Sequence, residues 1–182
     1  MIMTTEELRQ YMVTEEDDKG LEARLSALEH LIRAYTNNNF QVRATRRLAD
    51  IEYGAIVLQN TNTFKAGDTV QVTRSDYNDG LYTITDVVDE HLTVKEATRE
   101  EEDVYITLVH YPADVKMGVV NLMKWEMNNR EKVGVASESI SRHSVTYFDM
   151  TGENSAMGYP KALLGFLKPY MKARLGQGVR LC

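Results

Sequence analysis

Apolar residues recur every three or four positions through the N-terminal part of the chain, which is the spacing of one face of an α-helix. They include Leu21, Leu25, Leu28, Ile32 and Tyr35. Before them, Thr4-Thr5-Glu6-Glu7 has the form of a capping box, in which a hydroxyl and a carboxylate satisfy the first free N–H groups of a helix. The run Thr14-Glu15-Glu16-Asp17 repeats this start signal, and Asn37-Asn38-Asn39 ends the pattern. Residues 1–40 therefore predict a short helix, a turn and a longer amphipathic helix.

Between residues 41 and 111 the apolar residues recur at every second position, which is the spacing of a β-strand. β-Branched and aromatic residues gather there in short segments, several of which alternate apolar with polar positions. These segments are 56–58, 69–73, 81–85, 92–94 and 104–109. Turn-forming residues separate them at 65–68 and 78–80, and the acidic run 100–103 is typical of a solvated turn. Short strands at this spacing predict a small barrel or a curled sheet.

A helical pattern returns after Pro112, and its apolar residues lie on more than one side of the predicted helix. They are Val115, Val119, Val120, Leu122, Met123, Trp125 and Met127. A helix that is apolar on several sides is covered by more than one neighbour. Two interpretations of Trp125 are open. It is either a core position beneath the β segments or part of a subunit interface, where aromatic and Met residues are enriched.

Residues 132–158 are polar and have no clear period, apart from the strand-like piece Val145-Thr146-Tyr147-Phe148. Structureless stretches above about 12–15 residues are uncommon inside a compact domain and are often functional. The segment is either a disordered loop or an extended arm that orders against a partner. Pro160 then begins a last predicted helix, which Pro169 kinks or restarts. The stretch 161–182 carries five Lys or Arg and no Asp or Glu.

Composition narrows the class of protein without naming a function. The chain has 182 residues and a net charge of −6, so it is a poor candidate for gripping duplex DNA over its whole surface. Cys182 is the only cysteine, which argues against internal disulfides and predicts a reducing compartment. The N-terminus lacks a signal-peptide pattern, and no apolar run reaches the ~18 residues of a membrane span. We therefore expect a soluble intracellular protein with no membrane partner.

The residues that could carry chemistry form no catalytic or metal-binding pattern. The histidines, which share no short metal-ligand spacing, are His30, His91, His110 and His143. Ser141 lies close to His143, but no G-x-S-x-G motif accompanies them, and a polar loop is the simpler interpretation. We expect no metal, no cofactor and no enzymatic activity. A small hydrolase that uses Ser141 or His143 is the least favoured alternative.

Three groups of residues resemble the head–tail connector proteins of long-tailed phages, also called head-completion or adaptor proteins. The first group is Thr5 to Tyr11, the acidic residues 15–18 and a helix that ends near Asn39-Phe40. The second is Tyr111 to Lys116, which leads into Trp125-Glu126. The third comprises Ser137 to Tyr147, Gly158-Tyr159-Pro160, Leu163-Leu164 and Leu167 to Tyr170. The order S-V-T-Y, Y-P and L-x-x-Y in the third group is similar to connectors of phages that infect Gram-positive hosts.

The resemblance implies an α+β fold. Residues 1–40 and 112–182 would form a small helical bundle, the connector core, with an extended arm at 132–158. The strand pattern of residues 41–111, in which the chain departs from the family, adds an inserted small β-barrel-like domain. Members of the family join these helices by a shorter link, so the resemblance predicts no role for the insertion.

The resemblance also implies a structural function. Connector proteins form a ring, usually dodecameric, that docks beneath the portal protein, joins the head to the stopper or tail, and extends the DNA channel. Packaged DNA passes through the channel without specific binding. The protein would belong to the neck of the virion and would pass through the host cytoplasm during assembly. Candidate contact residues for partners or neighbouring subunits are Trp125, Met127, Val145, Tyr147, Phe148, Tyr159, Tyr170, Lys172 and Arg174.

The alternative is a nucleic-acid-binding adaptor that uses the surface of the 56–109 β segment. Such surfaces interleave basic and aromatic residues on one face of a sheet. The basic residues of that segment are Lys65, Arg74, Lys95 and Arg99. Many acidic residues surround them, which favours the connector over the adaptor.

Overall fold

The computed structural model describes residues 1–129, 137–140, 143–146 and 153–173. The chain divides into two compact units, each with its own apolar core. The first, here called the barrel unit, combines Met1–Ile2 with Asn39–Tyr111. The second unit combines Met3–Asn38 with Pro112–Cys182.

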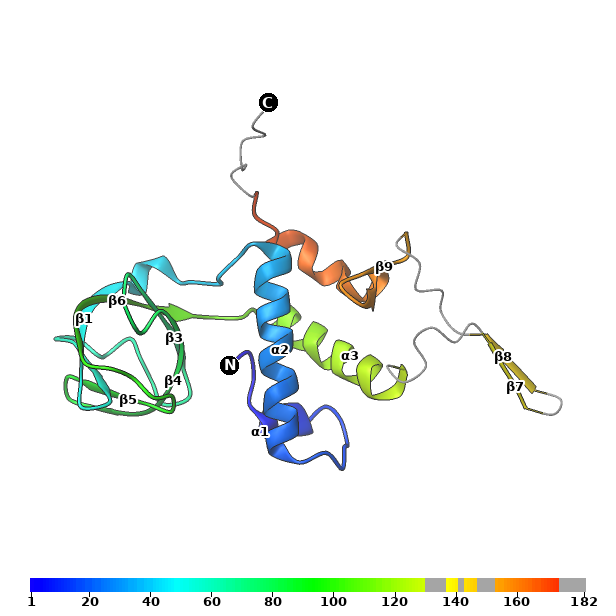
Figure 1. Cartoon of the computed structure of the whole chain (residues 1–182), viewed down its shortest axis with the longest axis horizontal. Helices are drawn as coiled ribbons and strands as arrows, with labels where there is room; N and C mark the ends of the chain where they lie inside the picture. The colour runs from blue at the N-terminus through cyan, green and yellow to red at the C-terminus, as the bar shows by residue number, and fades with distance from the viewer. Residues whose placement is uncertain (130–136, 141–142, 147–152, 174–182) are drawn as a thin grey trace. The chain divides into compact units, whose positions relative to one another are not determined.

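The barrel unit is a closed antiparallel barrel in which the strands follow the order β1-β2-β5-β4-β3-β6 (Figure 1). A short 3-10 helix, η1 (Arg43–Thr45), leads into it. The strands are β1 (Arg47–Glu52), β2 (Ala55–Val57), β3 (Thr69–Thr73), β4 (Gly80–Val88), β5 (His91–Val94) and β6 (Glu101–Val109). Closure pairs β1 with β6, so neither strand keeps a free edge.

Side chains alternate between the inside and the outside of the barrel, and those that point inward fill its core. Val70 and Val72 on β3, and Val104 and Ile106 on β6, are fully buried, while the residues between them face outward at least in part. The β1–β2 connection is a two-residue turn, because Glu52 pairs with Ala55. Its central residues, Tyr53 and Gly54, both have positive φ, as the tight hairpin turns that match strand twist require.

The five strand segments expected from the sequence are confirmed as β2 to β6. The sequence reading missed β1, whose residues Arg-Leu-Ala-Asp-Ile-Glu contain charges and few β-branched side chains. Pairing on both sides, with β2 and β6, holds this segment extended in spite of its weak propensity. That pairing is a tertiary effect, which local patterns do not show.

The second unit is built on two long helices. Its elements are α1 (Thr5–Arg9), α2 (Asp18–Thr36), α3 (Ala113–Asn129), β7 (Ser137–Ile140), β8 (His143–Thr146), β9 (Ser155–Ala156), β10 (Tyr159–Pro160) and the 3-10 helix η3 (Lys161–Tyr170). The capping box is confirmed, since the Thr4 hydroxyl accepts from the Glu7 N–H at 3.1 Å. Asp17 caps α2 in the same way through the Gly20 N–H at 2.8 Å.

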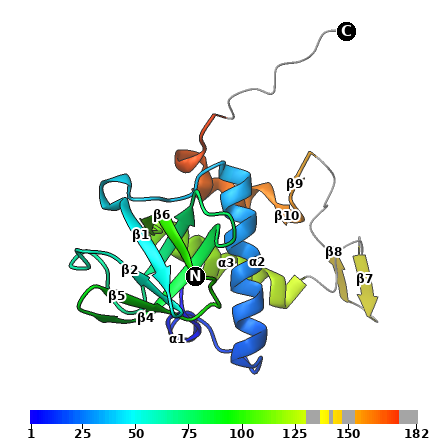
Figure 2. The same cartoon turned by 60° about the vertical axis from the view of Figure 1, so that its left-hand side comes forward.

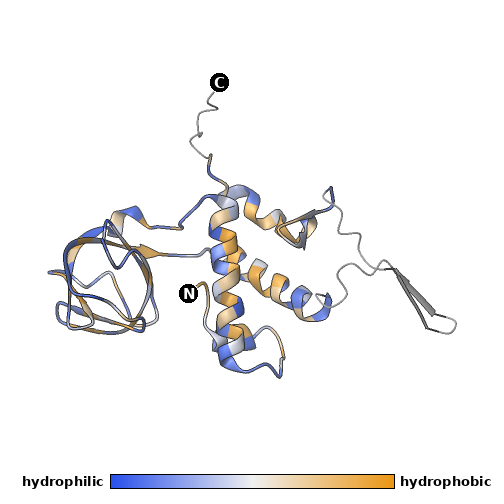
Figure 3. Cartoon of the chain, viewed as in Figure 1, coloured by the Kyte–Doolittle hydropathy of each residue, from blue (hydrophilic) through white to orange (hydrophobic). Residues whose placement is uncertain are grey.

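Helices α2 and α3 cross steeply in both Figure 1 and Figure 2, and each packs against η3. Most of their buried side chains are those of the apolar stripes, although α2 also buries Glu29 and Thr36. Figure 3 shows the apolar stretches in orange along both helices. Gly118 of α3 lies directly beneath Phe166 of η3, where a Cβ atom would collide with the Phe166 ring. The close approach of α3 and η3 therefore depends on a glycine.

The expected small helical bundle with an inserted barrel-like domain is wrong as a fold class. The closed barrel is the dominant regular structure, and the part of the chain that is described contains few helices. The last expected α-helix is the 3-10 helix η3, because Pro169 lacks an N–H and disfavours α-conformation at Lys168, and Gly165 interrupts the segment. Within the expected arm at 132–158, the described residues form the strands β7, β8 and β9 instead.

Candidate functional site

A hollow of about 390 Å³ lies on the surface of the second unit. We call it the α2–β10 hollow. Its lining residues are Ala23, Arg24, Ala27, Leu28, Leu31, Glu126 and Tyr159. They come from α2, from α3 and from β10, so the hollow exists only where these three elements meet.

The spacing of residues on α2 explains why the hollow is open. Leu21, Leu25 and Leu28 are buried in the core. Ala23 and Ala27, four residues apart, lie one above the other on an exposed face. Their methyl groups are too short to fill the space beside Tyr159, so the surface remains concave and mostly apolar.

Two of the candidate contact residues, one of which lines this hollow, are in contact with each other. Trp125 of α3 and Tyr159 of β10 have ring centroids 5.4 Å apart, tilted by 56°. Such an offset pair contributes about 0.5–1.5 kcal/mol beyond its burial. Tyr159 is 2% exposed, whereas Trp125 is half-buried and keeps part of its surface at the exterior. The pair therefore joins β10 to α3 and leaves an aromatic edge on the surface.

Charges of both signs stand at the rim. The Arg24 Nε donates to both carboxylate oxygens of Glu16, at 2.8 and 3.0 Å. The hydrogen bond that Arg24 donates to Glu16 raises the pKa of Arg24, and the charge of Glu126 acts in the same direction. An apolar floor with Arg24 and Glu126 on its rim suits an apolar side chain of a partner that also carries charged groups.

Tyr170 and Lys172 attach the end of η3 to the helices of the second unit. The Tyr170 hydroxyl donates to both oxygens of Asp114, at 2.7 and 2.8 Å, which raises the pKa of the Tyr170 hydroxyl. The Lys172 N–H donates to the Thr36 carbonyl at 2.8 Å. The geometry thus assigns both residues an intramolecular role, and a contact with a partner stays a prediction.

The other candidate residues do not gather at one place. Met127 lies half-buried on α3, and Val145 lies on β8, opposite Glu138 of β7. Tyr147, Phe148 and Arg174 lie outside the described residues.

No protein-family model matches the chain, and no curated protein matches it significantly.

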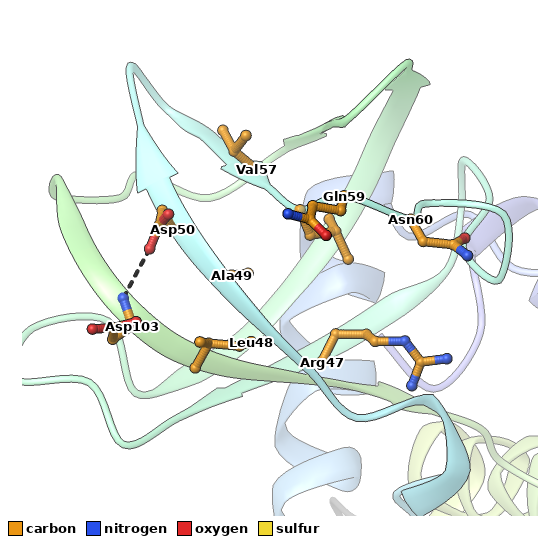
Figure 4. Close-up of a pocket in the computed structure, with 9 residues that line it drawn as sticks. Arg47, Leu48, Ala49, Asp50, Val57, Gln59, Asn60 and Asp103 are labelled. Carbon is orange, nitrogen blue, oxygen red and sulfur yellow. Dashed lines mark hydrogen bonds between the residues drawn. The ribbon is translucent and has the colours of Figure 1, made fainter.

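The barrel unit has a hollow of its own, of about 410 Å³, between β1 and the segment that follows β2 (Figure 4). Its polar lining includes Arg47, Asp50, Gln59 and Asn60. The Asp50 carboxylate accepts the Asp103 N–H at 2.9 Å, so it tethers β6 to β1. This lining contains no Ser, Cys or His, and therefore none of the usual pairs of nucleophile and base.

Among the residues that the structure describes, no group of three or more His, Cys, Asp or Glu side chains has the arrangement of a metal site. None of the helices in that part of the chain is both long and apolar enough to cross a bilayer.

Sequence reasoning missed the residues that make the α2–β10 hollow concave. Ala23 and Ala27 lie outside the apolar stripe of α2, so periodicity gives them no weight. The only local signal is their spacing of four, which places two small residues on one helix face. That signal becomes meaningful only when Glu126 and Tyr159 are known to lie beside them.

Proposed function

We propose that the protein is a structural subunit of the neck of a long-tailed phage, a head–tail connector that forms a ring beneath the portal. The observation that carries the proposal is the α2–β10 hollow, an exposed apolar concavity with a cation and an anion at its rim. A ring needs a head-to-tail interface in which one patch of each subunit receives a different patch of the next. The resemblance in residue order supplies the biological context.

The hairpin β7–β8 supports the same proposal. In the described part of the chain these strands pair only with each other, from Ser137–Thr146 to Ile140–His143. A two-stranded hairpin is marginally stable in water unless another element covers or extends it. Docking against a portal, a stopper or a second copy would supply that element.

The charge of the chain is compatible with a channel wall. A net charge of −6 repels phosphate, so DNA would pass without being held by the wall as a whole. The function is mechanical and involves no chemical step, and the protein would act in the virion neck after assembly in the host cytoplasm.

A variant that fills the hollow tests the interface. Ala27→Arg places a long cation on the exposed floor of the hollow, and should abolish ring formation while leaving the thermal melting temperature unchanged. Native mass spectrometry and negative-stain images, with and without the portal protein of the same phage, measure assembly.

Ser26→Arg is the matched control, because Ser26 is the exposed neighbour of Ala27 on α2 and does not line the hollow. It adds the same charge and should assemble normally. Wild-type protein that neither binds portal nor forms rings at high concentration would overturn the connector function. If Ala27→Arg still forms rings, the α2–β10 hollow is not part of the interface between subunits.

A further inference from the structure

Two arginines converge on one tyrosine at the outside of the barrel unit. The guanidinium carbon of Arg46 lies 5.8 Å from the centroid of the Tyr105 ring, and that of Arg74 lies 5.3 Å from it. Both distances are within the range of cation–π attraction. We call these three residues the arginine–tyrosine site.

The order of strands explains the convergence. Tyr105 of β6 pairs with Leu48 of β1 on one side and with Thr73 of β3 on the other. Val104 and Ile106 point into the barrel, so the ring of Tyr105 points outward. Arg46 precedes β1 and Arg74 follows β3, so the two cations approach the ring from the strands on either side of it.

Among the residues that the structure describes, no acidic side chain forms an ion pair with either cation. Within the described residues, the ion pairs of the chain involve other basic groups, and neither Arg46 nor Arg74 has a carboxylate within salt-bridge distance. The Arg46 Nε donates to the Thr107 hydroxyl at 3.3 Å, which leaves its terminal N–H groups available. Arg74 is exposed and has φ +62°, a left-handed conformation that is uncommon for a residue with a side chain.

The two arginines border a surface hollow of about 360 Å³. Asn39, Gln41 and Thr73 supply further polar groups to its lining. Leu48, the partner of Tyr105 on β1, is 52% exposed. Two fork-shaped cations, polar groups and an exposed apolar side chain therefore lie on one small area of the barrel.

We propose that the arginine–tyrosine site binds a phosphate group that carries a nucleoside. A guanidinium presents paired N–H donors that match phosphate oxygens, and its stacking on Tyr105 holds this fork in place. Leu48, which pairs with Tyr105 across β1 and β6 and lines the neighbouring hollow, adds an exposed apolar surface that a base could cover and a bare carboxylate could not. The source of the phosphate is a single-stranded nucleic acid or a free nucleotide.

This proposal does not rest on the connector function. All residues of the arginine–tyrosine site belong to the barrel unit, whereas the α2–β10 hollow belongs to the second unit. Failure of ring assembly would leave the proposal intact, and failure of phosphate binding would leave the connector intact.

Fluorescence anisotropy of a labelled oligothymidylate, titrated with the full-length chain at low salt, tests the site. Arg46→Gln and Arg74→Gln should each weaken binding about tenfold, since each removes charge-assisted hydrogen bonds. Each should also reduce the slope of log affinity against log salt by about 0.7, the value for one lost phosphate contact on a single strand. Thermal melting of both variants checks that the barrel remains folded.

Arg99→Gln is the matched control. Arg99 stacks on Tyr77 at 5.4 Å on the same barrel, so this variant removes one charge and one cation–π contact outside the site. It should bind like the wild type.

Competition identifies the source of the phosphate. Displacement by thymidine monophosphate at the same nucleotide concentration supports a free nucleotide, and displacement by unlabelled oligothymidylate alone supports a strand. Equal weakening in Arg46→Gln and Arg99→Gln, equal competition by polyglutamate, or absence of binding would each overturn the proposal.

Discussion

The side chain of Glu101, in the barrel unit, is held by several hydrogen bonds. Its carboxylate accepts from the Asn78 amide at 2.7 Å and also from the Ser75 hydroxyl and the Asp76 N–H. The Ser75 hydrogen bond is the largest of the effects that lower the pKa of Glu101 below its ordinary value of 4.5. Asn78 is 2% exposed and also exchanges hydrogen bonds with the Arg99 backbone, so the network fastens the loop after β3 to the start of β6.

This network predicts a pH dependence of stability. Because the pKa of Glu101 is lower in the folded state than in the unfolded state, the ionised carboxylate stabilises the fold above the unfolded value of 4.5. That contribution is lost as the pH falls through the lower, folded pKa. Urea denaturation should therefore show the wild type to be more stable than Glu101→Gln at neutral pH.

The difference between the two proteins should shrink steadily as the solution becomes more acidic. Glu102→Gln is the control, since Glu102 is exposed and is adjacent in the chain. A wild-type advantage over Glu101→Gln that stays constant at every pH would contradict the assignment of this stabilisation to the ionised carboxylate.

At the scale of elements, the contact between α3 and η3 sets the geometry of the second unit. Gly118 is buried in the middle of α3, where helix propensity alone would favour alanine by about 1 kcal/mol. A methyl group at this position would collide with Phe166, and overpacking of this kind costs about 1–3 kcal/mol. The steric effect therefore outweighs the gain in propensity.

Gly118→Ala should lower the free energy of unfolding, in contrast with the increase that helix propensity alone predicts. Chemical denaturation measures the change. Gly165→Ala in η3 is the control, because a Cβ there meets no atom within 4 Å. An unchanged or higher stability for Gly118→Ala would mean that η3 moves freely away from α3.

Prediction from sequence succeeded for elements whose signals are local. The capping box at Thr4 and the stripe from Leu21 to Ile32 depend on neighbours within one or two turns, and both elements form as expected. It failed where distant residues decide. Strand β1 is held by β6, more than fifty positions further along the chain for most of its paired residues. The expected helical bundle was wrong for this reason.

At the scale of the whole molecule, the connector proposal gives Trp125 two roles. It packs within the chain, and it contacts a neighbouring subunit or partner in the assembled neck. Phage that carry Trp125→Ala should fill their heads with DNA but fail to join tails, or should lose DNA from the heads. Electron microscopy of lysates and plaque yield measure the effect. Because Trp125 also contacts Tyr159, a thermal melt of the purified variant separates misfolding from failed assembly.

Tyr53→Asn provides the comparison for Trp125→Ala. It removes an aromatic side chain that is 92% exposed in a turn of the barrel unit, where Asn is well tolerated. Phage with this variant should form normal plaques. Normal tail joining by a folded Trp125→Ala protein would show that Trp125 is not part of a joint between subunits.

The sequence by itself determined the type and the approximate limits of most elements, because caps, turns and apolar periods act over a few residues. It also determined the acidic character of the chain. Only the tertiary structure decided which side chains share a surface. Arg46, Tyr105 and Arg74 meet because the barrel closes with β6 between β1 and β3, and Ala27 lies beside Tyr159 because α2 packs near β10. Such encounters depend on the pairing and packing of segments far apart in the chain, which no local pattern encodes.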